Sequence, residues 1–233
     1  MAIEEEDLSL IRELRSQHPG GTSCAILGDN VRNNLGLVIQ KDRVCNIGGY
    51  SSLIEFGESL GFDTVHTFDV VGNPTHKINL NEEIPDELKN SYDWIIDSGT
   101  LYCCFDISTV WKNILDLLSD KGKILHTSNI SGFYGRGFYS LSPALFRDFY
   151  NSNGFEILYC ATKTRLSRAW EEYSPEHTYL RFSSPTSLGF QMEAGSYQST
   201  IPNDALMACF AKRMTRTMFV KPLPQHFVNT AGK

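Results

Sequence analysis

Short apolar runs alternate along this chain with segments whose apolar residues recur at helical spacing. The runs expected to form strands are 24–27, 64–70, 77–80, 92–97, 123–127, 155–161 and 205–214. The amphipathic segments expected to form helices are 5–17, 51–60, 110–118 and 143–151, and a cap is expected for the third at 120–122. Most connections are short and contain glycine. Such alternation predicts an α/β fold with a mostly parallel sheet and helices on both faces.

Two segments of the sequence are candidates for the first strand. Residues 24–27 and residues 44–47 are both short apolar runs closed by glycine, at Gly28 and at Gly48-Gly49 respectively. Neither repeats nor a low-complexity linker divide the 233 residues, so we expect a single domain over 1–233. The stretch 167–195 lacks periodicity, and we interpret it as a substrate cover.

Charge and composition exclude several classes of function. The net charge is -6 and no run of lysine and arginine is present, so a nucleic-acid partner is not expected. No apolar stretch approaches the roughly 20 residues that span a bilayer, and the acidic amino terminus is unlike a signal peptide. The six cysteines include no C-x-x-C pair. These features predict a cytoplasmic protein with reduced thiols and no membrane association.

Polar residues and glycines follow the predicted strands, where ligands bind in open α/β sheets. Asp69 ends one strand about 20 positions after Gly48, a spacing at which an acidic side chain can accept both hydroxyls of a ribose. Asp69 could equally cap a turn. Asp97 and Ser98 end the next long strand. The chain lacks the G-x-G-x-x-G, phosphate-loop and G-x-S-x-G motifs, which disfavours dinucleotide enzymes, nucleotide triphosphatases and α/β-hydrolases.

Four segments together resemble class I S-adenosylmethionine-dependent methyltransferases. They are FDTVHTFD (62–69), DWIIDSGTLYCCF (93–105), KGKI (121–124) and GRGFYSLSP (135–143). The second and fourth are similar to the patterns D-x-V-I-D-G-G-T-L-E-H-V-F and G-H-G-F-Y-Q-F-S-P of a bacterial group of these enzymes. The resemblance extends over roughly residues 24–161 and, more loosely, the last strand.

The resemblance implies a Rossmann-like, seven-stranded sheet with S-adenosylmethionine as cofactor above the first strands. Asp69 would bind the ribose, and Gly28 or Gly48-Gly49 would lie beside the methionine part. Asp97 and Ser98 would line the cleft near the sulfonium. The substrate implied is a small molecule.

Two departures from the group pattern concern side chains that could act as a base or bind a metal. Tyr102-Cys103 replaces its Glu-His pair, and Arg136 replaces its second histidine, so no metal is expected. His126 and Tyr102 remain as candidate catalytic residues, although a histidine or tyrosine in such positions can equally be part of the core. Arg136 and Tyr139 are candidate substrate-binding residues, with solvation and packing as their alternatives.

The sequence therefore favours a small-molecule methyltransferase that uses S-adenosylmethionine. The alternative is a methyltransferase-like protein that has lost methyl transfer and binds a ligand or partner, or catalyses a different reaction. A nicotinamide-dependent oxidoreductase on the same type of sheet is a weaker third possibility, because the dinucleotide motif is absent.

Overall fold

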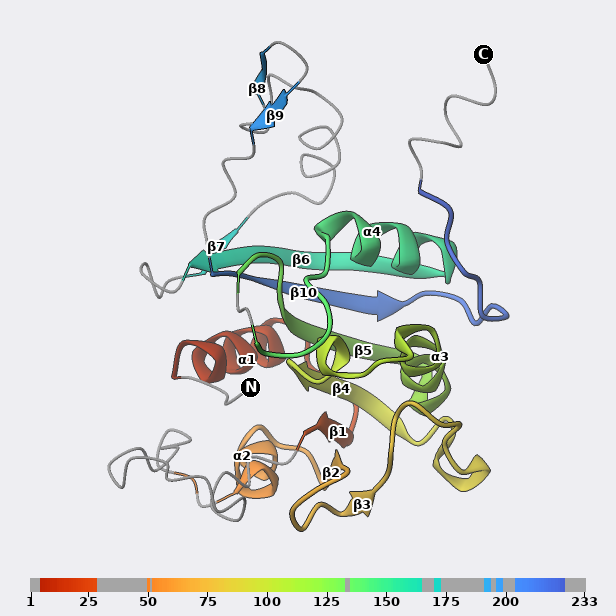
Figure 1. The fold of residues 1–233 in the computed structure, drawn as a ribbon. Helices are drawn as coiled ribbons and strands as arrows, with labels where there is room; N and C mark the ends of the chain where they lie inside the picture. The colour runs from red at the N-terminus through yellow and green to blue at the C-terminus, as the bar shows by residue number, and fades with distance from the viewer. Residues whose placement is uncertain are drawn as a thin grey trace. The chain divides into compact units, whose positions relative to one another are not determined.

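A computed structural model describes residues 5–28, 50, 52–132, 135–164, 170–172, 191–193, 196–198 and 204–224 (Figure 1). The chain divides into two compact units, residues 1–125 and 126–233, and each is described by itself. The elements of the first unit are α1 (Glu5–Gln17), β1 (Ser23–Leu27), α2 (Leu53–Ser59), β2 (Thr64–Asp69), β3 (His76–Lys77), η1 (Asp86–Leu88), β4 (Tyr92–Ser98), η2 (Leu101–Cys103), α3 (Ile107–Leu117) and the first part of β5 (Leu118–Asn129).

The strands of the first unit are ordered β3-β2-β1-β4-β5. β1 pairs in parallel with β2 on one side and with β4 on the other, and β2 pairs in parallel with β3. The chain thus proceeds outward from β1 to β3 and then returns to the opposite side of β1. This reversal creates a topological switch point, where ligands of open α/β sheets bind beyond the carboxyl ends of the strands.

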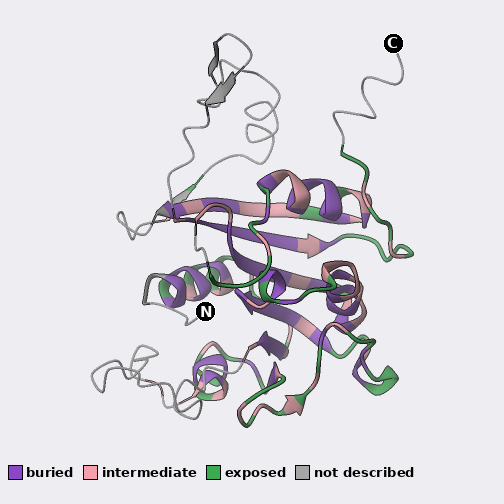
Figure 2. Cartoon of the chain, in the orientation of Figure 1, coloured by how far each residue is buried: buried purple, intermediate pink, exposed green. Residues whose placement is uncertain are grey.

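The second unit contains the end of β5, α4 (Pro143–Ser152), β6 (Phe155–Thr164), β7 (Glu171–Glu172) and β10 (Ala205–Arg213), in the strand order β5-β10-β6-β7. β10 is antiparallel to β6. A separate hairpin pairs β8 (Gln191–Glu193) with β9 (Ser196–Gln198). Most of β10 is buried, as is most of β1 in the first unit (Figure 2). Continuous burial of this kind is expected for strands covered on both faces.

Arg15, in the last turn of α1, holds two connections of the first unit together, the one between α1 and β1 and the one between α2 and β2. Its guanidinium donates to the carbonyl oxygens of Leu60 at 3.2 Å, Gly20 at 2.7 Å and Gly21 at 3.0 Å. The same group lies 4.2 Å from the ring centroid of Phe62. A planar cation with several fixed donors satisfies both kinds of contact at once, which lysine does not.

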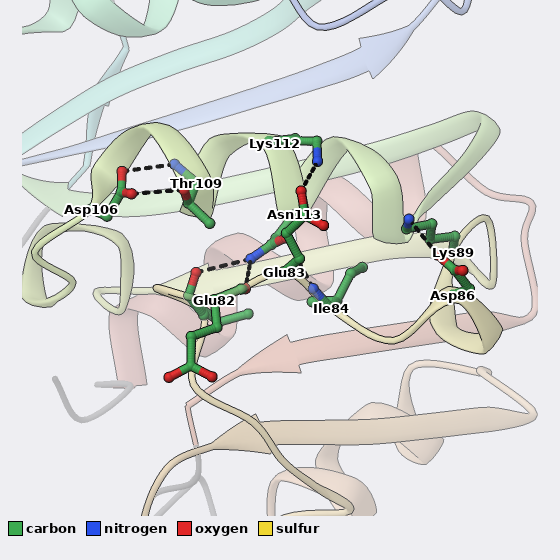
Figure 3. A network of polar contacts seen from close by, with 10 residues as sticks. Glu82, Glu83, Ile84, Asp86, Lys89, Asp106, Thr109, Lys112 and Asn113 are labelled. Atoms are coloured by element: carbon green, nitrogen blue, oxygen red, sulfur yellow. Dashed lines mark hydrogen bonds and ion pairs between the residues drawn. The ribbon is translucent and has the colours of Figure 1, made fainter.

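The loop after β3 is fastened to α3 by one buried amide (Figure 3). Asn113 Nδ2 donates to the carbonyl oxygens of Leu80 at 2.9 Å and Glu82 at 2.6 Å, and its Oδ1 accepts from the Ile84 amide at 3.3 Å. These bonds satisfy backbone groups of an irregular segment that would otherwise be buried without partners. An ion pair between Lys112 and Glu83, at 2.6 Å, adds an exposed contact to the same connection.

Two of the predicted features differ from the structure. The strand predicted at 77–80 is the two-residue β3. The cap predicted at 120–122 is wrong, because α3 ends at Leu117 and β5 begins at Leu118. Gly122 lies inside β5, where an added Cβ would be 2.4 Å from Leu118 Cγ, so this glycine permits a close approach. The alternative first strand at 44–47 lies outside the described residues, and the described β1 includes 24–27.

Among the residues that the structure describes, no helix has the length and apolar character needed to cross a membrane. The proposed substrate cover at 167–195 falls almost entirely outside them. The expectation of a single domain stays a prediction.

Asp93, at the start of β4, ties three strand beginnings together. Its Oδ2 accepts from the amides of Thr22 at 2.8 Å and Ser23 at 3.3 Å, and its Oδ1 accepts from Ser119 Oγ at 3.0 Å. Burial acts to raise the pKa of Asp93, but the hydrogen bonds from Thr22, Ser119 and Ser23 together lower that pKa below its ordinary value of 3.8.

A carboxyl with a depressed folded-state pKa stabilises the fold above its unfolded pKa, and this contribution is lost as pH falls through the folded value. We therefore expect Asp93→Asn to lower the free energy of unfolding at pH 7 by about 1 kcal/mol, a value reduced for partial exposure. The deficit should shrink below about pH 3.8. Urea unfolding of wild type and Asp93→Asn at pH 7 and pH 3 measures this deficit in the free energy of unfolding. Asp63→Asn, at an exposed position, is the control. A deficit of equal size at both pH values would contradict the assignment.

Candidate functional site

Three predicted site residues lie side by side at the carboxyl ends of β2, β1 and β4. Leu27 is in register with Phe68 of β2 and with Asp97 of β4. Asp69 and Gly28 each follow one of these paired residues by a single position. The structure therefore brings Asp69, Gly28 and Asp97 to one edge of the sheet, at the switch point beside β1.

Gly28 turns the chain sharply at the end of β1. Its φ is +104°, a conformation that L side chains rarely adopt, and its amide donates to the Phe68 carbonyl at 2.7 Å. A Cβ added to Gly28 would lie 3.1 Å from Thr100 Oγ1. That hydroxyl in turn donates to the Leu27 carbonyl at 2.9 Å. Because Gly28 has no side chain, the backbone at the end of β1 is left open to a ligand on that side.

Asp69 is half-buried and shapes the turn that follows β2. Its Oδ1 accepts from the amides of Val70 at 2.7 Å and Val71 at 3.2 Å. The turn-capping alternative raised by the sequence is therefore present in the structure. The next two residues expose apolar surface, since Val70 is 51% and Val71 43% exposed.

Asp97 is fully buried at the end of β4. Its Oδ1 accepts from the amides of Thr100 at 2.7 Å and Leu101 at 3.3 Å, so this carboxylate fixes the start of η2. These bonds partly offset the cost of burying the carboxylate. Ser98, the next residue, is also buried.

The charges of both carboxylates reach Cys104, just after η2. Burial raises the pKa of the Cys104 thiol to about 12, and the negative charges of Asp97 and Asp69, together with the neighbouring Cys103, add to the increase. The carboxyl ends of β2 and β4 therefore share a region of negative potential.

The two candidate catalytic residues are enclosed. Tyr102, in η2 of the first unit, is 1% exposed. His126, at the start of the second unit, is fully buried, and its Nε2 lies 2.5 Å from the Tyr150 hydroxyl of α4. The His126 ring also contacts Phe146 edge-on. This environment is typical of a core histidine whose polar atom is satisfied within the protein.

The candidate substrate residues belong to the second unit. Arg136 is exposed, and Tyr139 is half-buried with its carbonyl accepting from Asn129 Nδ2 at 3.1 Å. Gly48 and Gly49 lie outside the described residues.

Sequence reasoning missed Thr100 and the valine pair after Asp69. Thr100 links Leu27 to Asp97, because its hydroxyl donates to the Leu27 carbonyl and its amide to Asp97 Oδ1. Its place two positions after the end of β4 is the available signal. The sequence predicts a strand that includes Val70, whereas β2 ends at Asp69.

Comparison with known proteins identifies solved structures that share this fold. No family model matches the sequence, and no curated protein matches it. The structure is similar to that of a candidate methyltransferase from Bacillus halodurans, with a TM-score of 0.50 and 9% identity over 90% of this chain and 99% of that one. It is also similar to the O-MT segment of StiE, with a TM-score of 0.50 and 12% identity over 92% of this chain and 75% of that one.

At identities this low the likeness shows a shared fold. The strand order and the antiparallel β10 agree with it, since β10 takes the place of the seventh strand in the order 3-2-1-4-5-7-6. The chain therefore has the Rossmann-like fold of class I S-adenosylmethionine-dependent methyltransferases, as the sequence predicts.

Proposed function

We propose that this protein is an S-adenosylmethionine-dependent methyltransferase acting on a small molecule, with the cofactor bound across the carboxyl ends of β2, β1 and β4. The observation that carries the proposal is the alignment of Asp69, Gly28 and Asp97 on adjacent parallel strands. Each offers a different chemistry to one ligand: an acidic acceptor, an uncovered backbone and a buried negative charge.

Asp69 is the proposed ribose ligand. A carboxylate has two oxygens and about four acceptor positions, so the turn contacts at Oδ1 are compatible with accepting ribose hydroxyls. Those contacts also fix the direction of the side chain, which lowers the entropy lost on binding. The exposed side chains of Val70 and Val71 supply an apolar surface for the adenine ring beside the ribose.

The negative potential near Asp69 and Asp97 favours a cationic ligand. S-adenosylmethionine carries a sulfonium and an ammonium group, whereas the pyrophosphate of a nicotinamide dinucleotide is an anion that two carboxylates would repel. The charge at the strand ends therefore supports the sulfonium cofactor over the oxidoreductase alternative. Gly48 and Gly49 stay candidates for the methionine part.

Methyl transfer requires chiefly that the acceptor be aligned with the methyl carbon, because the sulfonium already activates that carbon. The enclosure of His126 and Tyr102 makes alignment the larger contribution in this protein. Arg136, exposed in a loop rich in glycine, is the proposed ligand for an anionic group of the acceptor. Tyr139 is proposed to contact the acceptor through its ring.

A second function is favoured by the same enclosure. His126 and Tyr102 are the two predicted catalytic residues. If neither reaches a substrate, neither can act as the base for an acceptor that must lose a proton. The protein would then bind the cofactor without transferring its methyl group.

Asp69→Asn tests the cofactor site. Asparagine keeps an oxygen for the turn amides of Val70 and Val71 but removes the charge, so S-adenosylhomocysteine should bind about 10- to 100-fold more weakly in calorimetry. The matched control is Asp63→Asn, an exposed acid near the other end of β2, which should leave the affinity unchanged. Equal affinity in wild type and Asp69→Asn would refute the ribose role.

Gly28→Ala tests the close approach of the ligand to β1. Gly61 also has a positive φ, +79°, but no atom lies within 4 Å of its added Cβ. Gly28→Ala and Gly61→Ala should each destabilise the fold by about 1 kcal/mol through backbone strain. Only Gly28→Ala should also weaken binding of S-adenosylhomocysteine, by about 10-fold for a hindered contact. Parallel losses of affinity in both variants would count against this placement.

Methyl transfer separates the two candidate functions. The protein incubated with S-adenosylmethionine labelled in its methyl group and a pool of small molecules should yield a labelled product, detected by mass spectrometry. Asp69→Asn at the same cofactor concentration should yield less product, because it binds less cofactor. Cofactor binding without any labelled product favours the binding protein.

A further inference from the structure

Two imidazoles and a phenol converge within the first unit, on three different strands. His66 Nδ1 of β2 lies 2.8 Å from Tyr92 Oη of β4 and 3.2 Å from His76 Nε2 of β3. The third side of this triangle, from Tyr92 Oη to His76 Nε2, measures 3.4 Å. The rings also contact one another edge-on, with 4.9 Å between the centroids of His66 and His76 and 5.8 Å between those of His66 and Tyr92.

Hydrogen bonds account for at most two of the three contacts in this triangle. An imidazole nitrogen has either one N–H or one lone pair in the ring plane, so His66 Nδ1 makes a good hydrogen bond to only one of its two close neighbours. A chain from His76 through Tyr92 to His66 uses two sides of the triangle and leaves the 3.2 Å contact between the nitrogens unbonded. A cation inside the triangle would accept all three lone pairs.

The size of the triangle fits a transition-metal ion. Zinc binds histidine nitrogen at about 2.0–2.1 Å, and a tetrahedron with such bonds separates its ligand atoms by roughly 3.3 Å. The three observed separations, 2.8, 3.2 and 3.4 Å, are close to that edge length. Imidazole nitrogen is a preferred ligand of zinc, copper, iron and nickel.

The surroundings suit a bound cation. Tyr92 is 2% exposed, whereas His66 and His76 are half-buried, so solvent can supply a fourth ligand from the histidine side. Within the described ranges no three histidine, cysteine or acidic side chains are grouped for a metal, and the third donor here is a phenol oxygen.

We propose that His66 Nδ1, His76 Nε2 and Tyr92 Oη form a binding site for a divalent transition-metal ion such as Zn²⁺, completed by a water molecule. The site would fasten the two-residue edge strand β3 to β2 and β4. His76 is in register with Phe68, the residue before Asp69, but the site uses none of Asp69, Gly28 and Asp97. The proposal therefore does not depend on the proposed methyltransferase function.

Equilibrium dialysis of the full chain against Zn²⁺ tests the proposal, with Cys103→Ser as background because Cys103 alone is exposed among the described cysteines. We expect one Zn²⁺ per chain and a rise in Tm on binding. Tyr92→Phe, which keeps the ring, and His76→Gln should each weaken binding at least about 10-fold. His18→Gln, a half-buried histidine outside the triangle, is the matched control and should bind as the background does.

NMR spectra of the imidazole protons give a second, independent measurement of Zn²⁺ binding that needs no substitution at the site. Zn²⁺ should shift the resonances of His66 and His76 and leave those of His126 in place. No binding of Zn²⁺ by the background protein would overturn the proposal, and so would an affinity of Tyr92→Phe and His76→Gln equal to that of the background protein. Shifts confined to other histidines would also overturn it.

Discussion

The pairing of β1 with two neighbours determines most of what the first unit can do. β1 has hydrogen-bonded partners on both edges, and its last residue, Leu27, fixes the ends of β2 and β4 at the same level. A shift of one residue in either register would move Asp69 or Asp97 to the other face of the sheet, because side chains alternate along a strand. Burial of nearly all of β1 makes such a shift costly.

The two ends of β4 use the same chemical group for different tasks. Asp93 collects amides and a hydroxyl where the strands begin, and thereby holds those beginnings together. Asp97 accepts the amides of η2 where β4 ends, and so determines the shape of the turn at the proposed cofactor site. Backbone amides donate to both carboxylates, the partly exposed Asp93 and the buried Asp97.

The strand order and the residues at the strand ends fit the shared fold, although sequence identity to the solved structures is low. Identities of 9% and 12% to solved structures leave few side chains in common, yet the strand order and the antiparallel last strand are retained. Backbone geometry at a switch point needs only a turn without a side chain and an acceptor on the next strand. Gly28 and Asp69 meet those needs here, while the enclosure of His126 by Tyr150 and Phe146 separates this histidine from solvent.

The sequence by itself determined the elements and the edge of the sheet where polar residues gather. Periodicity and capping are local properties, so the helix at Glu5–Gln17, the strand ending near Asp69 and the α/β class followed from short stretches of residues. Only the tertiary structure decided that residues 24–27 form a central strand, that β5 begins at Leu118, and that His126 belongs to the core. It also brought His66, His76 and Tyr92 together. These outcomes depend on pairing and burial between residues far apart in the chain, which local patterns do not encode.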